Sequence, residues 1–215
     1  MNVESPQRRN DMGLWKVWSL LCLGASSQMG LNPIAGSQLH VLLYLANTLS
    51  PLFGVSPIRG RVLKRGKYPF YPDVQREIDR LAFSGVLKIE KVEYGSRGHL
   101  AAHYGLGDKG DSITKKLIQF DPELQKTARL FRELVYASFG KFLGTHIDIG
   151  PIDANFGDDA ILNGEVVDFS EWKNSNKNMA VARYLLDQLR SLQPNSERDG
   201  VRLYCDYLDE ALSPA

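Results

Sequence analysis

The hydrophobic residues of this chain recur at helical spacing in several segments. One apolar stripe begins after Ser37, a residue type favoured as a helix N-cap, and ends before Pro51, which cannot continue a helix. Its members are Leu39, Leu42, Leu43, Ala46 and Leu49. The spacing therefore predicts a helix between Ser37 and Pro51.

Other segments predict helices on the same grounds. The apolar run from Leu14 to Leu23 predicts a first helix that stops at Gly24, after a polar, frayed segment 1–12 and before a loop that reaches Gly36. Further helices are expected over 110–118, 121–142, 178–192 and 198–212. The helix over 121–142 has an apolar face too broad to be left in solvent, so it must pack against something.

Residues 72–106 combine a helix with a hairpin. Pro72 stands at a first helical position, apolar residues follow at helical spacing, and Gly85 closes the helix. Residues 86–94 and 99–106 are rich in strand-forming residues and are separated by the turn sequence GSRG. Helix, strand, turn and strand in this order are typical of the recognition helix and wing of a winged helix-turn-helix module.

The segment before this helix is basic. Residues 59–67 carry five positive charges and no acid, which fits either a short edge strand or a basic loop. Little room remains for the second helix of a standard helix-turn-helix, because the stretch between Leu49 and Pro72 contains Pro51, Gly54, Pro57, Gly60 and Gly66. This composition argues against ordinary operator recognition.

We therefore expect an α+β chain that is mostly helical, with a winged helix-turn-helix core, a two-stranded wing and additional C-terminal helices. The predicted segments are an N-terminal helix and loop over 1–36, a winged-helix domain over 37–118 and a helical C-terminal region over 119–215. Within the last region, residues 144–172 are expected to form a long connection with a strand near 166–169.

Composition and charge refine this picture. With 43% hydrophobic and 24% charged residues, the chain has the composition of an ordinary soluble globular protein, which excludes collagen, mucin and disordered classes. Residues 1–145 hold 20 Lys and Arg against 12 Asp and Glu, a net charge of +8, whereas residues 146–215 hold 6 against 13, a net charge of −7. Contact with nucleic acid is therefore expected only from the first two thirds, unless the division is ordinary scatter between two surfaces.

The cysteines and the apolar runs bear on location. Cys22 and Cys205 have no CxxC or histidine spacing near them, which argues against a zinc site and a disulfide framework and favours a reducing cytoplasm. The apolar stretch near the start is too short for a spanning helix, which needs about 20 residues, and is too interrupted for a signal peptide. We expect a cytoplasmic protein with no membrane partner.

Motifs for common chemistry are absent. The sequence has no Walker A motif, no GxGxxG after a strand, no GxSxG and no HExxH, so neither a cofactor nor a catalytic residue is predicted. One group of residues resembles a site for a divalent cation that could support phosphodiester hydrolysis: His146, Asp148, Asp153, Asp158 and Asp159. A polar loop with aspartates in its turns is the simpler interpretation, and we prefer it.

Nucleic-acid contact has a defined set of candidates. These are Arg59, Arg61, Lys64, Arg65 and Lys67 of the basic run and Arg97 of the wing. The helix that follows carries Arg76 and Arg80 but also the acids Asp73, Glu77 and Asp79, whose spacing leaves no wholly basic face. Because such acids would face a DNA groove, we expect the helix and wing to dock proteins, and the basic run to be the part that meets a phosphate backbone.

The candidate partner-binding residues are aromatic: Trp15, Trp18, Phe131 and Phe139. For the two tryptophans, the alternative is that an aromatic stripe at helical spacing belongs to the core. Among the histidines, His40 is expected to be a packing residue, while His99 and His103 lie on the wing and either touch phosphates or face solvent.

Three stretches together resemble a known family: QLHVLLYLAN (38–47), VLKRGKYPFYPDVQREIDRLAFSGVL (62–87) and IDANF (152–156). They are similar to the small middle component of bacterial three-component defence systems built around an SMC-like ABC ATPase, of which Lamassu is the best-known kind. The resemblance implies a non-enzymatic subunit that sits with the ATPase heads and links them to an effector, commonly a nuclease. Double-stranded DNA would then be met through the complex.

A second resemblance keeps another function open. Antitoxin-like proteins also begin with a Leu-Leu-Tyr-Leu-Ala helix, so a winged-helix transcriptional regulator or antitoxin is the alternative. A metal nuclease built on His146 and Asp148 is the third and least supported hypothesis. The preferred expectation is an accessory subunit of an SMC-like ATPase complex in antiphage or antiplasmid defence.

Overall fold

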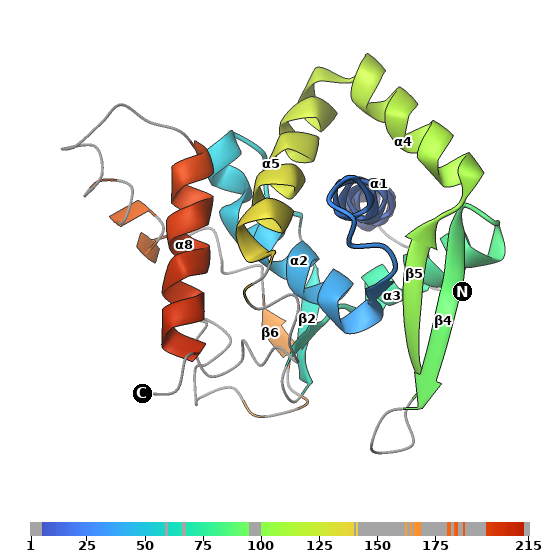
Figure 1. Cartoon of the computed structure of the whole chain (residues 1–215), viewed down its shortest axis with the longest axis horizontal. Coiled ribbons are helices and arrows are strands. Elements are labelled where there is room, and N and C mark those ends of the chain that lie inside the picture. Colours follow the sequence, from blue (N-terminus) through green and yellow to red (C-terminus); the bar gives the residue numbers. More distant parts are fainter. Residues whose placement is uncertain are drawn as a thin grey trace.

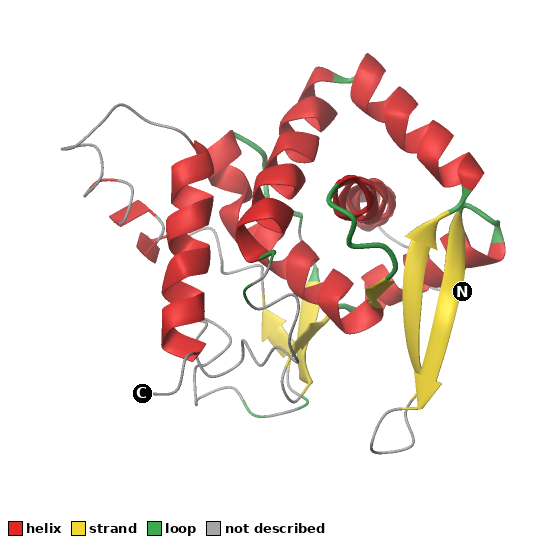
Figure 2. Ribbon diagram, in the orientation of Figure 1, coloured by secondary structure: helices red, strands yellow, loops and turns green. Residues whose placement is uncertain are grey.

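A computed structural model describes residues 6–58, 60–65, 68–94, 100–139 and 197–212, together with short pieces between 141 and 187. Over these residues the chain is mostly helical and contains two small antiparallel sheets (Figures 1 and 2). The prediction of a mostly helical α+β chain is thus confirmed. In the described part of the chain, no helix combines the length and the apolar character needed to cross a membrane.

The elements follow in chain order. The helices are α1 (Pro6–Gln28), α2 (Gly36–Leu49), the 3-10 helix η1 (Ser50–Phe53), α3 (Pro72–Phe83), α4 (Asp108–Phe120), α5 (Pro122–Ser138) and α8 (Glu197–Leu212). The strands are β1 (Ile34–Ala35), β2 (Arg61–Arg65), β3 (Tyr68–Phe70), β4 (Leu87–Tyr94), β5 (Leu100–Leu106) and β6 (Val166–Asp168).

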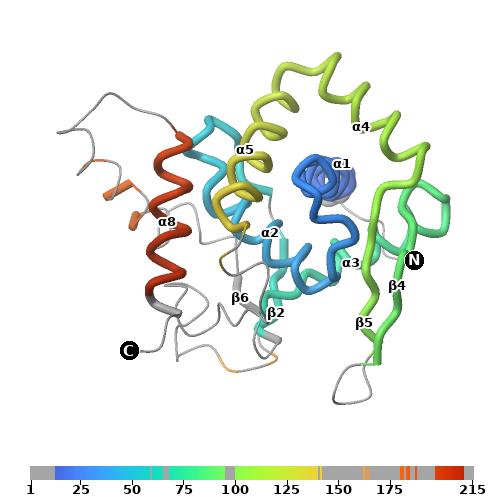
Figure 3. Tube along the Cα trace, in the orientation of Figure 1, coloured from blue at the N-terminus to red at the C-terminus, as the bar shows by residue number. Residues whose placement is uncertain are grey.

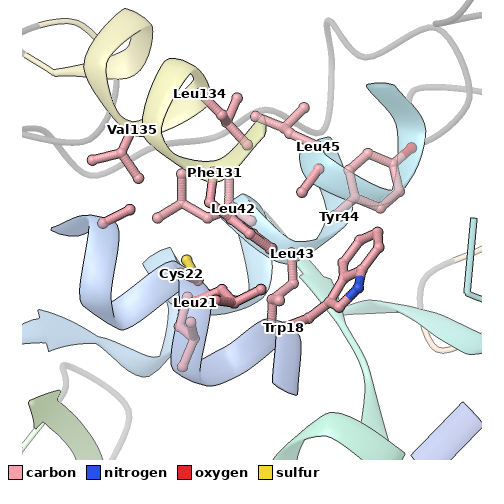
Figure 4. Close-up of a cluster of buried hydrophobic side chains, with 14 of the residues drawn as sticks. Trp18, Leu21, Cys22, Leu42, Leu43, Tyr44, Leu45, Phe131, Leu134 and Val135 are labelled. Atoms are coloured by element: carbon pink, nitrogen blue, oxygen red, sulfur yellow. The ribbon is translucent and has the colours of Figure 1, made fainter. Parts of the chain in front are cut away.

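Helix α1 lies at the centre of the molecule, where Figure 1 shows it end-on among the other helices. It packs against α2, α3, α4 and α5. In the core, Trp18, Leu21 and Cys22 of α1 meet buried side chains of α2 and α5 (Figure 4). Buried residues of the predicted segments 1–36, 37–118 and 119–215 all belong to this one hydrophobic cluster.

The first helix is longer than the apolar run predicts. It begins at Pro6, inside the segment expected to be frayed, and passes through Gly24 to Gln28. A Cβ at Gly24 would lie 3.1 Å from Cγ2 of Thr114, so this glycine allows α1 and α4 to approach closely. The expected helix stop at Gly24 is therefore wrong, because the residue serves a helix contact instead of a C-cap.

Helix α2 confirms the stripe between Ser37 and Pro51, although it is more buried than a single stripe implies: all its residues from Leu39 to Leu49 are inaccessible. Its N-cap is Ala35, not Ser37, and the side chain of Gln38 accepts a hydrogen bond from the Ala35 amide at 2.9 Å. Near its other end, the buried Asn47 accepts a hydrogen bond from the Ile58 amide at 2.7 Å and donates one to the Ile58 carbonyl at 3.0 Å. This pair holds the loop after η1 against α2.

Two three-stranded sheets flank the helices. In the first, the order is β1-β5-β4, and all pairings are antiparallel. In the second, the order is β3-β2-β6, so the basic run supplies a central strand instead of the edge strand or loop that its sequence predicts. Between α2 and α3 the described chain contains η1, β2 and β3 but no α-helix, as the prolines and glycines predict.

The broad apolar face of α5 is covered by this chain itself. Helix α5 packs against α1, α2, α4 and α8, and its buried residues include Leu130, Phe131 and Leu134. On the outer side of the contact with α8, Arg129 pairs with Glu197 and Glu133 pairs with Arg198. The prediction that this face packs against something is confirmed, and the covering elements are intramolecular.

Candidate functional site

The β4–β5 hairpin forms one side of the molecule, and the chain runs through it directly from α3 into α4 (Figure 3). Its strands agree closely with the predicted strands over 86–94 and 99–106. The cross-strand pairs are regular except at Glu90, an extra residue that forms a β-bulge between Ile89 and Lys91. This bulge decides which side chains share a face.

One face of the hairpin is apolar along its whole length. Residues directly opposite each other in an antiparallel pair lie on the same face, so the register assigns this face to Leu87, Ile89, Val92 and Tyr94 of β4 and to Leu100, Ala102, Tyr104 and Leu106 of β5. At the base of the hairpin, Leu87 and Tyr104 are buried in the core. The apolar face thus starts inside the molecule and continues outward along the strands.

The outer half of this face is uncovered. Exposed fractions are 53% for Ile89, 55% for Val92, 84% for Tyr94 and 64% for Leu100. We call these four residues the distal apolar face. Scattered exposed apolar residues are normal on a soluble protein, but four large ones on one face of two paired strands form a contiguous patch.

The opposite face of the hairpin is polar. Lys91 pairs with Glu93, and His103 lies 3.2 Å from the same carboxylate. These two partners hold the pKa of Glu93 below its usual range, with the Lys91 hydrogen bond as the larger cause. His103 therefore interacts with a carboxylate, while His99 lies outside the described residues.

A polar network fixes the hairpin relative to α2 and α3. The side-chain oxygen of Gln75 lies 3.2 Å from Nε2 of His40, and its amide nitrogen donates to Asp79 at 2.8 Å and to the Tyr104 hydroxyl at 3.3 Å. Nδ1 of His40 accepts from the Tyr71 amide at 3.3 Å. His40 is thus a buried residue with hydrogen-bond partners, in agreement with its expected packing role.

The acids of α3 do not all face outward. Glu77 is fully buried, with Oε1 accepting from Arg80 at 2.6 Å and Oε2 lying 3.1 Å from Nζ of Lys16 on α1. Asp73 pairs with Arg76 on the helix surface. The expectation that Glu77 would face a DNA groove is therefore wrong, because this carboxylate turns toward α1 and neutralises a lysine there.

The basic run is only partly described. Arg61 is exposed and Lys64 is half-buried on β2, and the backbone of Arg65 belongs to the same strand. Arg59, Lys67 and Arg97 lie outside the described residues. The register places Asp168 of β6 directly opposite Arg61, so a strand from the C-terminal third borders β2.

Three of the four aromatic candidates are core residues. Trp15, Trp18 and Phe131 are at most 2% exposed, and Trp18 packs edge-on against Phe131 with ring centroids 5.5 Å apart. We therefore correct their assignment to a partner-binding surface: they stabilise this chain's own core, as the alternative for the tryptophans predicts. Phe139, which is 51% exposed, lies on the surface at the end of α5.

The candidate metal ligands His146, Asp148, Asp153, Asp158 and Asp159 all lie outside the described residues. Among the residues that are described, no group of three or more His, Cys, Asp or Glu side chains is arranged to hold a metal ion. Both cysteines are buried and unpaired, and burial raises the pKa of Cys205 to about 12. A thiol in this state is protonated and poorly nucleophilic.

The distal apolar face was missed by sequence reasoning. Strict alternation along LKIEKVEY places Ile89 and Val92 on opposite faces of the strand, and only the bulge at Glu90 brings them together.

Comparisons of the chain with models of protein families, with curated proteins and with solved structures found no match.

Proposed function

We propose that this chain is a non-enzymatic accessory subunit that bridges an SMC-like ABC ATPase and a nuclease effector in a bacterial antiphage or antiplasmid defence complex. Its docking element is the β4–β5 hairpin, used as the wing of a winged helix-turn-helix module. The resemblance of segments 38–47, 62–87 and 152–156 to the middle component of such systems names the partners. The geometry of the hairpin supplies the surface.

The order of elements supports the winged-helix assignment. Helices α1, α2 and α3 precede the hairpin, and the short strand β1 between α1 and α2 pairs with β5, so that β5 is central in the sheet. Three helices followed by a hairpin, with a short strand that completes a three-stranded sheet, are what we expect of a winged-helix module. The insertion of η1, β2 and β3 between α2 and α3 is the departure from it.

One observation carries the proposal: the distal apolar face is exposed on a hairpin that extends directly from the core. A wing that contacts DNA uses basic or polar side chains against phosphates, because phosphate contacts supply most of the affinity. Here the exposed residues are Ile89, Val92, Tyr94 and Leu100, and on the opposite face Lys91 and His103 both pair with Glu93. Such a surface is suited to an apolar patch on another protein.

The surface of α3 fits the same role. Its two arginines each pair with an acid of the same helix, Arg76 with Asp73 and Arg80 with Glu77. Their charges are therefore partly compensated within the helix, which weakens their attraction for phosphates. A helix of mixed charge beside an apolar wing suits a protein partner with a polar rim around an apolar centre.

Co-purification tests the proposal. The chain is expressed with a tag together with the products of its neighbouring genes, and the expected result is recovery of an ATPase with Walker motifs. The variant carrying Tyr94→Ser and Leu100→Ser on the distal apolar face should lose that ATPase, whereas Phe120→Ser, which removes a 76% exposed aromatic residue from α4, should retain it. Failure of the unaltered chain to recover any ATPase would exclude the proposed function.

A winged-helix transcriptional regulator or antitoxin is the second candidate. The observation that favours it is the inward position of Glu77, which removes one acid from the surface that α3 would present to a groove. A gel shift on the promoter of its own operon, titrated with salt, tests this function. Binding without preference for the promoter over unrelated DNA of the same length would exclude it.

A further inference from the structure

Strand β4 is the outer strand of its sheet. It pairs with β5 on one side, and no strand among the described residues pairs with its other side. The strand is eight residues long, and every residue from Lys88 to Tyr94 is exposed. An edge of this length presents a row of backbone N–H and C=O groups to any second strand that approaches it.

The charges of β4 are complementary to those of a second, antiparallel copy. In a pair centred between Glu90 and Lys91, Glu90 of one chain lies opposite Lys91 of the other, and Lys88 lies opposite Glu93. The two-fold symmetry repeats both pairs, so all four charged positions of LKIEKVEY meet an opposite charge. Opposite charges that face each other across two strands stabilise the pairing, whereas like charges oppose it.

The apolar positions match in the same register. Leu87 lies opposite Tyr94 of the second copy, and Ile89 lies opposite Val92. All four belong to the apolar face of the hairpin, so each pair is formed on one face of the joined sheet. Ile89 and Val92, each more than half exposed in the single chain, gain an apolar neighbour in this way.

The bulge at Glu90 makes this register possible. Without it, Ile89 and Val92 would lie on opposite faces, and a symmetric pair could not place them opposite each other. With the bulge, Glu90 and Lys91 of one chain face Lys91 and Glu90 of the other. Both strands then have the same number of residues across the bulge, so the pairing stays in register. A bulge usually protects a sheet edge from pairing, but here the second strand carries the same bulge at the matching position.

We infer that two copies of this chain associate by antiparallel pairing of their β4 edges, which joins the two β1-β5-β4 sheets into one continuous sheet across a two-fold axis. Each chain has one β4 edge, and the pairing occupies it in both copies, so no β4 edge remains for a third chain. The product is therefore a closed dimer and not a fibre. It uses the edge of the hairpin: Ile89, Val92 and Tyr94 gain neighbours beside them across the junction, while the outward surface of the distal apolar face stays open to a further partner. The inference is thus independent of the proposed function.

Charge reversal at the centre of the pair tests the inference. Glu90→Lys places lysine opposite Lys91, and Lys91→Glu places glutamate opposite Glu90, so each variant alone replaces two attractive pairs with two repulsive ones. Sedimentation equilibrium of the full chain should show a dimer, and each variant should raise its dissociation constant by about 10- to 100-fold. An equimolar mixture of the two variants restores opposite charges at both positions and should form a heterodimer about as stable as the unaltered dimer.

The mixture also serves as the folding control, because variants that fail to fold cannot rescue each other. Lys115→Glu on α4 makes the same charge change at an exposed lysine away from β4 and should leave the dimer unchanged. A chain that remains monomeric at the highest concentration it tolerates would overturn the inference. A dimer that withstands both single reversals, or that the mixture fails to restore, would overturn it as well.

Discussion

Two glycine-to-alanine substitutions in helices should change stability in opposite directions. Gly110 lies in the first turn of α4, and a Cβ built on it would stand only 2.2 Å from the carbonyl oxygen of Val86. Gly13 lies inside α1, is exposed, and has no atom within 4 Å of its Cβ position. The first position therefore requires glycine for a close approach between α4 and the base of the hairpin, whereas the second does not.

The expected magnitudes follow from these contacts. At Gly110, alanine forces α4 and the backbone at Val86 apart, which costs roughly 1–3 kcal/mol. The same shift weakens the hydrogen bond from the Gly107 amide to the Val86 carbonyl, 3.0 Å long, by about 1 kcal/mol. The better helix propensity of alanine returns about 1 kcal/mol, so Gly110→Ala should lower the free energy of unfolding by roughly 1–3 kcal/mol. Gly13→Ala should raise it by about 0.5–1 kcal/mol.

Urea unfolding followed by circular dichroism measures both changes in the same buffer. Because the two substitutions are chemically identical, the opposite sign isolates the contact at Val86 from the intrinsic preference of alanine for helices. A Gly110→Ala variant as stable as the unaltered chain would refute the close approach of α4 to the hairpin. A Gly13→Ala variant that loses stability would contradict a regular, exposed helix at that position.

Three further predictions concern buried polar groups and thiols. Asn47→Ala should cost roughly 2–4 kcal/mol in urea unfolding and accelerate hydrogen exchange at the Ile58 amide, because both polar groups of Ile58 lose their partner; unchanged exchange would contradict the paired arrangement. Glu77→Gln should lower the free energy of unfolding by only about 1–2 kcal/mol, less than the 3–5 kcal/mol typical when a wholly buried ion pair is broken. The reason is that Lys16 and Arg80, its two cationic partners, are about half exposed and return to water. A larger loss of unfolding free energy, measured in high salt, would contradict this. Burial raises the pKa of Cys205 to about 12 and that of Cys22 well above its usual range. The thiols of the unfolded chain ionise at about pH 8.5, whereas those of the folded chain stay protonated to a higher pH. The free energy of unfolding is therefore unaffected below that pH, and it falls by about 1.4 kcal/mol per thiol and pH unit as the pH rises toward the folded pKa values. The double variant Cys22→Ala, Cys205→Ala should therefore show a flatter decline in stability above pH 8.5, and an equal slope would exclude the mechanism.

Local sequence determined several elements of this protein. Helix α3 and the hairpin have nearly their predicted bounds, since Pro72, Gly85 and the alternation of strand-forming residues act over a few neighbours. The absence of an α-helix between α2 and α3 in the described chain was likewise predictable from prolines and glycines. Such features depend on backbone conformations that each residue type allows by itself.

Helix ends and burial partners depended on contacts that no local pattern contains. Gly24 continues a helix because α4 packs on it, and the apolar face of α5 is covered by α1 and α8 of the same chain. Trp15 and Phe131 are core residues for the same reason. An apolar face in a sequence shows that something covers it, but the identity of the covering surface is a property of the tertiary fold.

The distal apolar face shows most clearly what the sequence determined and what the tertiary structure decided. The sequence determined that β4 and β5 form a hairpin with alternating apolar and polar residues. Only the tertiary structure decided that Glu90 bulges, because a bulge depends on how β5 pairs with β4 while its base is anchored by Tyr104. That one extra residue reverses the alternation at the middle of β4, unites Ile89 with Val92 on one face, and leaves the outer half of that face without cover.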